Sequence, residues 1–470
     1  MIARTIIAVV VAGAILIVAF FAWARHPAID PIAPPDPHGL DTALVRRGAQ
    51  LAVLGNCNTC HTAPGRKSFA GGVAVGTPFG TIYSTNITPD RETGIGNWSE
   101  AAFRRSMREG VDRAGRHLYP AFPYDHFTLL TDEDDHALYA YLMSREPVRA
   151  AAPHNELRFP FNLRIALAGW KLLFLPKGPF EPVASGSETW NRGAYLVEGL
   201  AHCGACHTPR NRLGAENKND RFGGGEAEGW TAYALNHASP APVPWDVDAL
   251  YAYLRNGWQR VHGLARGPMA PVIDNLGVAS DADVRAIAIY IASMSGTPTP
   301  ERRRKADELL ARTGVHGPDS TPVSGDSTTT TQAAKVNGSG ADMGGMIYQS
   351  ACAVCHESGR PIPFGGMDLA LSTAMQGPNP INVINAVLAG LPAAEGERSP
   401  IMPGFAGALS EAQLADLIVY LRAHFSDKGP WTDVAKHVRD AMTRNRRFAT
   451  YATDGNASAP ADSSQREKPW

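Results

Sequence analysis

The pattern Cys-x-x-Cys-His occurs three times in this 470-residue chain and constrains its fold more than any other feature. The three copies are Cys57, Cys60 and His61; Cys203, Cys206 and His207; and Cys352, Cys355 and His356. Neighbouring copies lie about 150 residues apart and use all six cysteines, so no cysteine remains for a disulfide. A repeat of this length predicts three similar structural units.

Helical patterns stand before and after each copy of the motif. Segments 43–54, 189–200 and 345–350 precede the motifs with apolar residues at helical spacing. Later in each unit a Ser or Thr stands three residues before an Asp or Gln and opens an apolar helical pattern; these pairs are Thr131 and Asp134, Ser280 and Asp283, and Ser410 and Gln413. Each unit is therefore predicted to run as helix, motif, loops and helix.

The motif has the residues needed to attach haem covalently. Its two thiols can add to the vinyl groups of haem as thioethers, and the adjacent histidine is then held at the iron. A zinc site would need further paired ligands nearby, and a dithiol exchange site does not explain the histidine. We therefore predict three covalently bound haem c groups, with the six cysteines as attachment points and His61, His207 and His356 as iron ligands.

Two methionines are candidate sixth ligands of the iron. Met269 lies in a Gly-Pro-Met-Ala-Pro loop and Met402 in a Pro-Ile-Met-Pro-Gly loop, each shortly before a closing helix. A methionine in such a loop is not on an apolar helical face, so axial ligation is favoured over a role in the core.

The first unit departs from this pattern. Phe122 stands where the methionine is expected, and a phenylalanine cannot coordinate iron. His126 is the preferred replacement because it lies four residues further on, with His117 and Met107 as other candidates. The alternatives are a five-coordinate haem and a histidine that only forms hydrogen bonds.

The N-terminus predicts either a membrane anchor or an export signal. Ile6 to Ala24 contains no charged residue and would form about 28 Å of helix, close to the apolar thickness of a bilayer. Arg4 precedes it, so the start of the chain is expected to stay cytoplasmic and the rest to face the periplasm. Ala22-Trp23-Ala24 resembles a cleavage site, but the apolar segment is longer than is usual for a signal peptide, which favours an anchor in the inner membrane.

These features divide the chain into seven segments. We expect an anchor or signal at 1–25, haem units at 40–150, 186–300 and 342–426, an apolar connector at 151–185, a flexible linker at 301–341, and a basic helix with a disordered tail at 427–470. The connector is interpreted as a helix packed between units; the alternative is a surface for a partner or the membrane. The net charge of −1 gives no reason to expect nucleic-acid binding.

Several stretches resemble the three-haem cytochrome c subunits of membrane-bound bacterial dehydrogenases. They include Ser84–Pro89, Gly94–Ser99, Tyr119–Ala121, Cys203–Thr208, Met269–Pro271 and Met402–Gly404, and the likeness covers about residues 40–425. It implies a mainly α fold of three tandem class-I-like cytochrome c domains behind an N-terminal transmembrane helix. It also implies an electron-transfer subunit that serves a periplasmic dehydrogenase and passes electrons to ubiquinone or a terminal oxidase.

Residues 120–128 are more similar to the branch that serves molybdopterin enzymes, which also have an iron–sulfur subunit, than to the quinoprotein alcohol dehydrogenase branch. The favoured partner is therefore a molybdopterin dehydrogenase of aldehydes or nitrogen heterocycles such as nicotinate. We find no nucleophile–base constellation, so no catalytic residue is predicted. The other two hypotheses are a haem enzyme of the peroxidase or reductase type with an open first haem, and a cytochrome subunit of a terminal oxidase.

Overall fold

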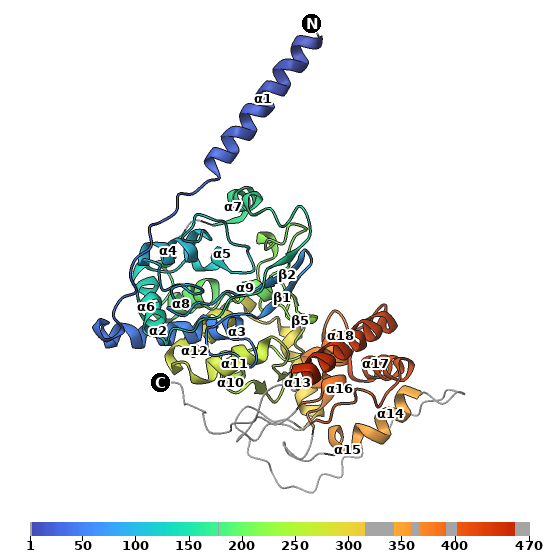
Figure 1. Cartoon of the computed structure of the whole chain (residues 1–470). Coiled ribbons are helices and arrows are strands. Elements are labelled where there is room, and N and C mark those ends of the chain that lie inside the picture. The colour runs from blue at the N-terminus through green and yellow to red at the C-terminus, as the bar shows by residue number, and fades with distance from the viewer. Residues whose placement is uncertain (1, 177, 315–342, 359–365, 392–401, 456–470) are drawn as a thin grey trace.

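A computed structural model describes residues 2–176, 178–314, 343–358, 366–391 and 402–455, and helices dominate it (Figure 1). The helices of the N-terminal half are α1 (Ile2–Trp23), α2 (Thr42–Leu54), α3 (Cys57–His61), α4 (Glu100–Glu109), α5 (Tyr124–Phe127), α6 (Asp132–Met143), α7 (Leu167–Phe174), α8 (Glu188–Tyr195) and α9 (Gly204–His207). Those of the C-terminal half are α10 (Val247–Asn256), α11 (Met269–Val278), α12 (Asp281–Ser295), α13 (Pro300–Arg312), α14 (Met343–Ala351), α15 (Ala353–His356), α16 (Ile381–Ala389), α17 (Glu411–Phe425) and α18 (Val434–Gly455).

The strands are short and antiparallel. They are β1 (Ala74–Thr77), β2 (Gly80–Tyr83), β3 (Glu156–Leu157), β4 (Gly225–Ala227), β5 (Trp230–Ala232), β6 (Trp258–Gln259) and β7 (Gly263–Leu264). They form one sheet in the order β1-β2-β3 and the hairpins β4-β5 and β6-β7. Short turns of other helix types are η1 (Pro37–Gly39), η2 (Arg164–Ala166), η3 (Leu196–Leu200), η4 (Lys218–Asp220), η5 (Leu369–Leu371) and η6 (Thr373–Gln376).

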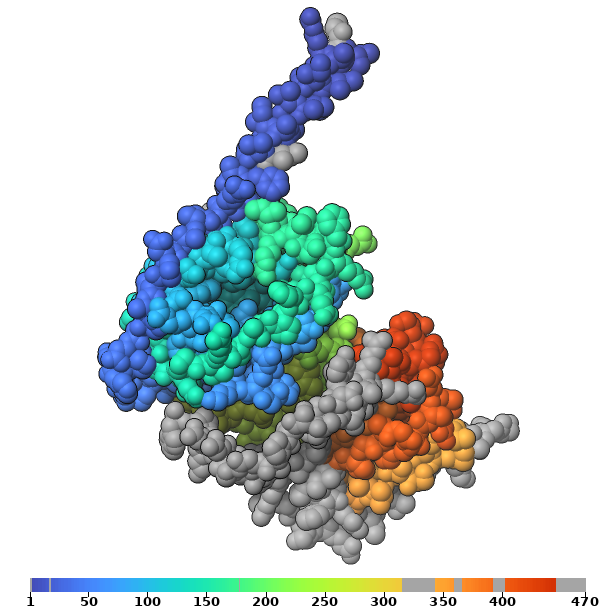
Figure 2. Space-filling model, viewed as in Figure 1, coloured from blue at the N-terminus to red at the C-terminus, as the bar shows by residue number. Residues whose placement is uncertain are grey.

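Helix α1 extends away from the rest of the molecule (Figures 1 and 2). It has 22 residues, and its length and apolar composition would allow it to cross a membrane, although a signal sequence has the same properties. The choice between anchor and cleaved signal therefore stays a prediction.

A crossing of two helices recurs three times, once in each of the units that the sequence repeat predicts. Helix α2 packs on α6, α8 on α12, and α14 on α17. Each first helix has a glycine at the crossing, because a Cβ there would overlap a backbone carbonyl and the Cβ of a tyrosine on the second helix; these sites are Gly48 with Tyr141, Gly193 with Tyr290, and Gly344 with Tyr420. Thr131, Ser280 and Ser410 cap α6, α12 and α17 as expected.

The first two crossings belong to one hydrophobic core, and the third has its own. One cluster of buried residues runs from Leu51 to Ile291, whereas the other runs from Tyr348 to Ala441. In the space-filling view the orange and red third region forms a lobe beside the blue and green body (Figure 2). The predicted boundary near residue 185 is therefore not a boundary of the hydrophobic core.

The apolar connector is only partly packed between units. Trp170 of α7 contacts the ring of Tyr124 in the first unit, and its indole N–H donates to the carbonyl of Leu213 in the second, 3.0 Å away. The other face of α7 exposes Leu172 and Leu173, and Figure 1 shows α7 at the end of the body from which α1 departs.

The later segments agree in part with their predicted boundaries. Helix α13 occupies the first part of the predicted linker 301–341. Residues 315–341 of that linker lie outside the described residues. Helix α18 packs on α16 and α17 with Val438 and Ala441 buried, so the expected basic helix covers the third core. The predicted tail from 456 onward also lies outside the described residues.

Candidate haem-binding sites

Each Cys-x-x-Cys-His motif forms a short helical turn directly after the first helix of its crossing. The turns are α3, α9 and α15. Turn α3 follows α2, α15 follows α14, and α9 follows η3, which directly continues α8. The chain reverses before the first two turns through left-handed residues, Asn56 with φ of 57° and His202 with φ of 40°. This reversal turns the cysteines and the histidine away from the preceding helix axis.

The three motif histidines share one hydrogen-bond geometry. The Nδ1 atoms of His61, His207 and His356 lie 2.7, 2.6 and 2.8 Å from the backbone carbonyl oxygens of Thr85, Tyr233 and Met367. A carbonyl can only accept, so each Nδ1 carries the proton and each Nε2 has a free lone pair. Histidines that bind a metal are commonly oriented in this way, by a hydrogen bond from the second ring nitrogen to a carbonyl or carboxylate oxygen.

Burial favours the neutral form of these groups. It lowers the pKa of His61 and His207, which keeps the imidazole in the form that binds a metal. It raises the pKa of Cys57 and Cys203 to about 12, so these thiols are not thiolates at neutral pH. Thiol exchange requires a thiolate, so a role of these cysteines in disulfide exchange is disfavoured.

A cavity of about 610 Å³ joins the second and third sites and suits a large, mostly apolar cofactor. Its walls include Cys203, Cys206, His207, Met269, Cys352, Cys355, His356 and Met402, and Cys60 of the first motif also borders it. The two predicted methionines therefore line the same cavity as the motif histidines. The residues fit haem because apolar walls surround paired cysteines and a histidine with free Nε2.

The two methionines are positioned by different local structures. Met269 is the first residue of α11, after Pro268 as the N-cap residue. Met402 exchanges two backbone hydrogen bonds with Leu391, of 2.8 and 3.0 Å. Both positions keep the side chain at the cavity wall, and ligation of iron by either stays a prediction.

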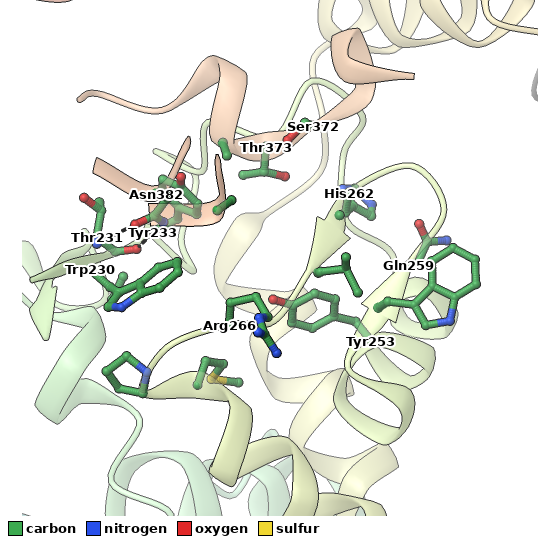
Figure 3. A pocket seen from close by; sticks show the side chains of 18 of the residues that line it. Trp230, Thr231, Tyr233, Tyr253, Gln259, His262, Arg266, Ser372, Thr373 and Asn382 are labelled. Atoms are coloured by element: carbon green, nitrogen blue, oxygen red, sulfur yellow. Dashed lines mark hydrogen bonds between the residues drawn. The ribbon is translucent and has the colours of Figure 1, made fainter. Parts of the chain in front are cut away.

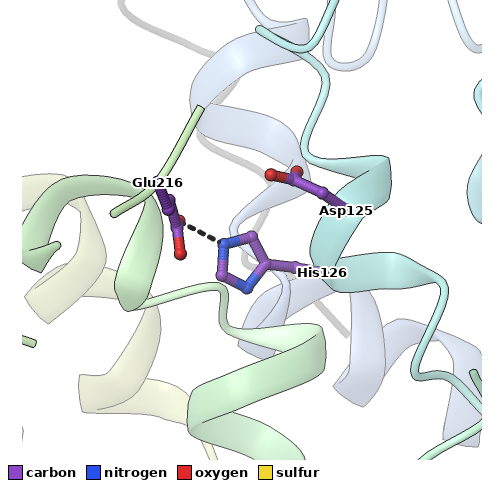
Figure 4. Close-up of side chains that lie close together, drawn as sticks. All are labelled: Asp125, His126 and Glu216. Carbon is purple, nitrogen blue, oxygen red and sulfur yellow. Dashed lines mark hydrogen bonds and ion pairs between the residues drawn. The ribbon is translucent and has the colours of Figure 1, made fainter. Parts of the chain in front are cut away.

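His126 is buried, and both of its ring nitrogens have protein partners, of which Figure 4 shows Glu216. Nδ1 lies 2.6 Å from the carbonyl oxygen of Glu198, and Nε2 lies 2.7 Å from the carboxylate of Glu216. To bind iron in the first unit, His126 would have to give up one of these contacts with the second unit. Its predicted role as a ligand therefore stays untested, and no pattern in the sequence indicates Glu216 as its partner.

The other candidates for the first unit are also engaged. His117 lies 2.8 Å from the carbonyl oxygen of Ala24 through Nε2 and 3.0 Å from the amine of Lys171 through Nδ1. Met107 is buried in the first core, and Phe122 packs against Tyr124 and Phe127. The first site is thus built differently from the other two.

Asp125, His126 and Glu216 are the one group of three His, Cys, Asp or Glu residues, within the part of the chain that the structure describes, whose ligand atoms come close enough to share an ion. Burial raises the pKa of Asp125. Among the described residues, none of the three Cys-x-x-Cys-His motifs belongs to such a group.

The helix crossings, the motif turns and the histidine geometry define a c-type cytochrome. Consistent with this, the cytochrome c family profile matches residues 45–146, and the profile of subunit III of cbb3-type cytochrome c oxidase matches residues 340–421. Cytochrome c domains imply covalently bound haem c.

Three relatives define the family more narrowly. A nicotinate dehydrogenase subunit from Pseudomonas putida is 44% identical over 87% of this chain, which spans only 32% of that protein. The cytochrome c subunit of gluconate 2-dehydrogenase from Pantoea cypripedii is 35% identical over 88% of this chain and 92% of its own. The fructose dehydrogenase cytochrome subunit from Gluconobacter japonicus is 34% identical over 86% and 84%. The chain therefore belongs to the family of dehydrogenase cytochrome c subunits, and the predicted resemblance is confirmed.

Proposed function

We propose that this chain is the electron-transfer subunit of a dehydrogenase complex, with three haem c groups in three tandem cytochrome c domains. The observation that carries the proposal is the repeated geometry of His61, His207 and His356, each with Nδ1 bound to a carbonyl oxygen. Homologues that are cytochrome c subunits of dehydrogenases support electron transfer as the function.

The residues have distinct roles in this proposal. Haem iron supplies one-electron oxidation and reduction when it is bound. The cysteines hold each group by thioethers, and the motif histidines provide one axial nitrogen. Met269 and Met402 provide sulfur at the second and third sites, which favours reduced iron and raises the potential. His126 is the proposed ligand at the first site and would lower the potential there.

The contacts between units support a relay from one site to the next. His202, beside the second motif, has Nε2 3.3 Å from the carbonyl oxygen of Gly55, beside the first motif. The side-chain amide of Asn275 donates to the oxygens of Asn56 and Asn58 in the first motif region. The second and third sites border one cavity, and Cys60 of the first motif borders it as well.

The location and the partners are part of the same proposal. We infer that α1 anchors the chain in the inner membrane and that the haem domains face the periplasm. The catalytic partner is a molybdopterin subunit with an iron–sulfur subunit, because residues 120–128 resemble that branch and the nicotinate dehydrogenase relative is a strong match. Electrons then pass to ubiquinone or a downstream oxidase.

The test is to express the full chain in a host that matures c-type cytochromes and to purify it with its native membrane complex. Mass spectrometry should show three haem adducts on the polypeptide, and redox titration should resolve a first haem distinct from the others. Fewer adducts, or three identical potentials, would contradict the proposal. Co-purification with a quinoprotein or a copper–haem oxidase would replace the molybdopterin partner.

A second candidate function follows from the first site. Phe122 cannot bind iron, and both ring nitrogens of His126 and of His117 have protein partners. If His126 and His117 keep these contacts when haem is bound, the first haem is open and five-coordinate, as in a peroxidase or reductase. Rapid carbon monoxide binding to one haem, together with turnover of peroxide, would support this function over a pure relay.

A further inference from the structure

His262 lies in the turn between β6 and β7 and is held firmly in place. Its ring stacks on the indole of Trp245 with centroids 3.5 Å apart and planes 13° apart. Its backbone N–H donates to Gln259, and its carbonyl accepts from the N–H of Thr373, 3.2 Å away in the third unit. The side chain is 4% exposed. Stacking on Trp245 and the two backbone hydrogen bonds hold the imidazole of His262 in this position.

Both ring nitrogens of His262 lack a hydrogen-bond partner among the described residues, and so does the hydroxyl of Thr373. These atoms border the cavity that joins the second and third haem sites (Figure 3). Buried polar atoms are nearly always hydrogen-bonded in folded proteins. The unmatched atoms of His262 and Thr373 therefore indicate a polar group from whatever fills the cavity.

The donors that line this cavity suit a carboxylate. The imidazole N–H and the Thr373 hydroxyl can both donate, and the Arg266 guanidinium lines the same cavity (Figure 3). Glu228 also borders the cavity, but it is exposed, and its negative charge contributes to the raised pKa of the Cys60 thiol. Haem carries two propionate carboxylates on the edge opposite the vinyl groups that join the cysteines, so it would bring a carboxylate into the cavity.

We propose that His262 is a positioning residue that donates a hydrogen bond to a haem propionate at the junction of the second and third units, with the Thr373 hydroxyl as a second donor. This inference rests on the haem binding proposed above. Because His262 comes from the second unit and Thr373 from the third, one propionate would join the two units. The carboxylate belongs to either the second or the third haem.

The expected consequence is electrochemical. A donor at the propionate offsets its negative charge, which otherwise stabilises the more positive, oxidised iron. Loss of the donor should therefore lower the midpoint potential of one haem and leave its axial ligands unchanged.

The experiment compares H262L, H262Q and T373V with a matched control, H237L, in the full chain matured with haem. His237 is an exposed histidine of the same unit. Spectroelectrochemical titration should show that H262L lowers one potential, that H262Q restores most of it because its amide also donates, and that T373V causes a smaller fall. H237L should match the wild type. The variants M269H and M402H identify which potential belongs to the second and which to the third haem, and so which propionate is bound.

Two results would overturn the proposal. One is that the potentials of both H262L and T373V are unchanged. The other is that H262L loses a methionine–iron absorption band, which would mean that the axial ligands of a haem have changed. If H262L matures poorly, H262Q and T373V still decide the question. Haem counting by mass spectrometry in the wild type tests the proposed function separately, because a missing adduct there contradicts the haem sites themselves and not the role of His262.

Discussion

The first two units are built on the same helix crossing but differ at the places that decide their chemistry. Gly48 on Tyr141 in the first unit corresponds to Gly193 on Tyr290 in the second, and Arg47–Asp134 corresponds to Arg192–Asp283, paired at 2.7 and 2.8 Å. The second unit has Met269 at the cavity wall, whereas the first has Phe122 packed among aromatic rings.

A second difference lies inside the closing helices. Asp135 is fully buried in α6, while the equivalent positions of α12 and α17 hold the buried aliphatic residues Val284 and Leu414. The comparison teaches that the helix crossing is a common scaffold. The units differ in the residues beside the candidate haem sites and inside the closing helix, and the crossing itself stays the same.

The largest expected effect tests the scaffold. G48L or G193L would force a side chain into a backbone carbonyl at the crossing, so each should lower the free energy of unfolding by at least about 3 kcal/mol. G76L is the control, because no atom lies within 4 Å of a Cβ at Gly76. Denaturant unfolding followed by circular dichroism measures the effect, and equal losses in G48L and G76L would show that the crossing is not the scaffold.

The next effect tests the difference between the haem sites. M269H should abolish the methionine–iron absorption band of one haem and lower its potential by on the order of 0.1 V, since axial ligands span a range of about 0.8 V. F122M should add a methionine–iron band at the first haem. M294L, a change at a methionine away from the cavity, is the control. If F122M gains no such band, Phe122 and Met269 are not equivalent positions.

The sequence predicted the local parts of this architecture well because they depend on residues close together in the chain. The motif turns, the helix caps and the closing helices all follow from periodicity and short spacings. Contacts between distant segments could not be predicted. Glu216 binds His126 from 90 residues away, and Thr373 meets the turn of His262 across the junction of two units. Neither pair leaves a pattern in the sequence.

The shared core of the first two units could not be predicted either. The repeat predicts equal units, but η3 packs against both α2 and α5 of the first unit, so a single cluster forms. Periodicity shows which face of a helix is apolar, not which neighbour covers it.

A third prediction concerns the buried carboxylate of the first unit. This carboxylate belongs to Asp135. Its Oδ2 accepts a hydrogen bond from Arg108 Nε at 2.5 Å, whereas its Oδ1 lacks a partner among the described residues. Burial raises the pKa of Asp135 to about 7. Between about pH 4 and pH 7 the folded chain therefore holds a proton that the unfolded chain releases, and stability falls as the pH rises through this range.

D135N should remove this fall, which we expect to amount to at most about 4 kcal/mol, because the pKa of Asp135 is raised by about three units and each unit corresponds to about 1.4 kcal/mol. The measurement is the free energy of unfolding of wild type and D135N at several pH values. E133Q, at an exposed acid of the same helix, is the control. Parallel curves for wild type and D135N would mean that Arg108 keeps Asp135 ionised in the folded chain.

The smallest expected effect extends the comparison to the third unit, which joins the second through polar contacts and not through a common core. The Thr231 hydroxyl donates to Asn379 at 2.9 Å, and its backbone N–H and carbonyl bind the amide of Asn382 at 2.8 and 2.9 Å. T231V removes only the hydroxyl bond and should cost about 1 kcal/mol. Amide hydrogen exchange in β5 should then become about five times faster, because local opening is favoured by the same amount.

T231S keeps the hydroxyl and should exchange as the wild type does. If T231V also exchanges at the wild-type rate, the polar junction does not hold the third unit in place, and apolar contacts or the cofactor in the cavity must do so. If exchange rises as expected, the third unit is a separately packed body whose attachment depends on single hydrogen bonds, in contrast to the first two units, which cannot part without exposing their common core.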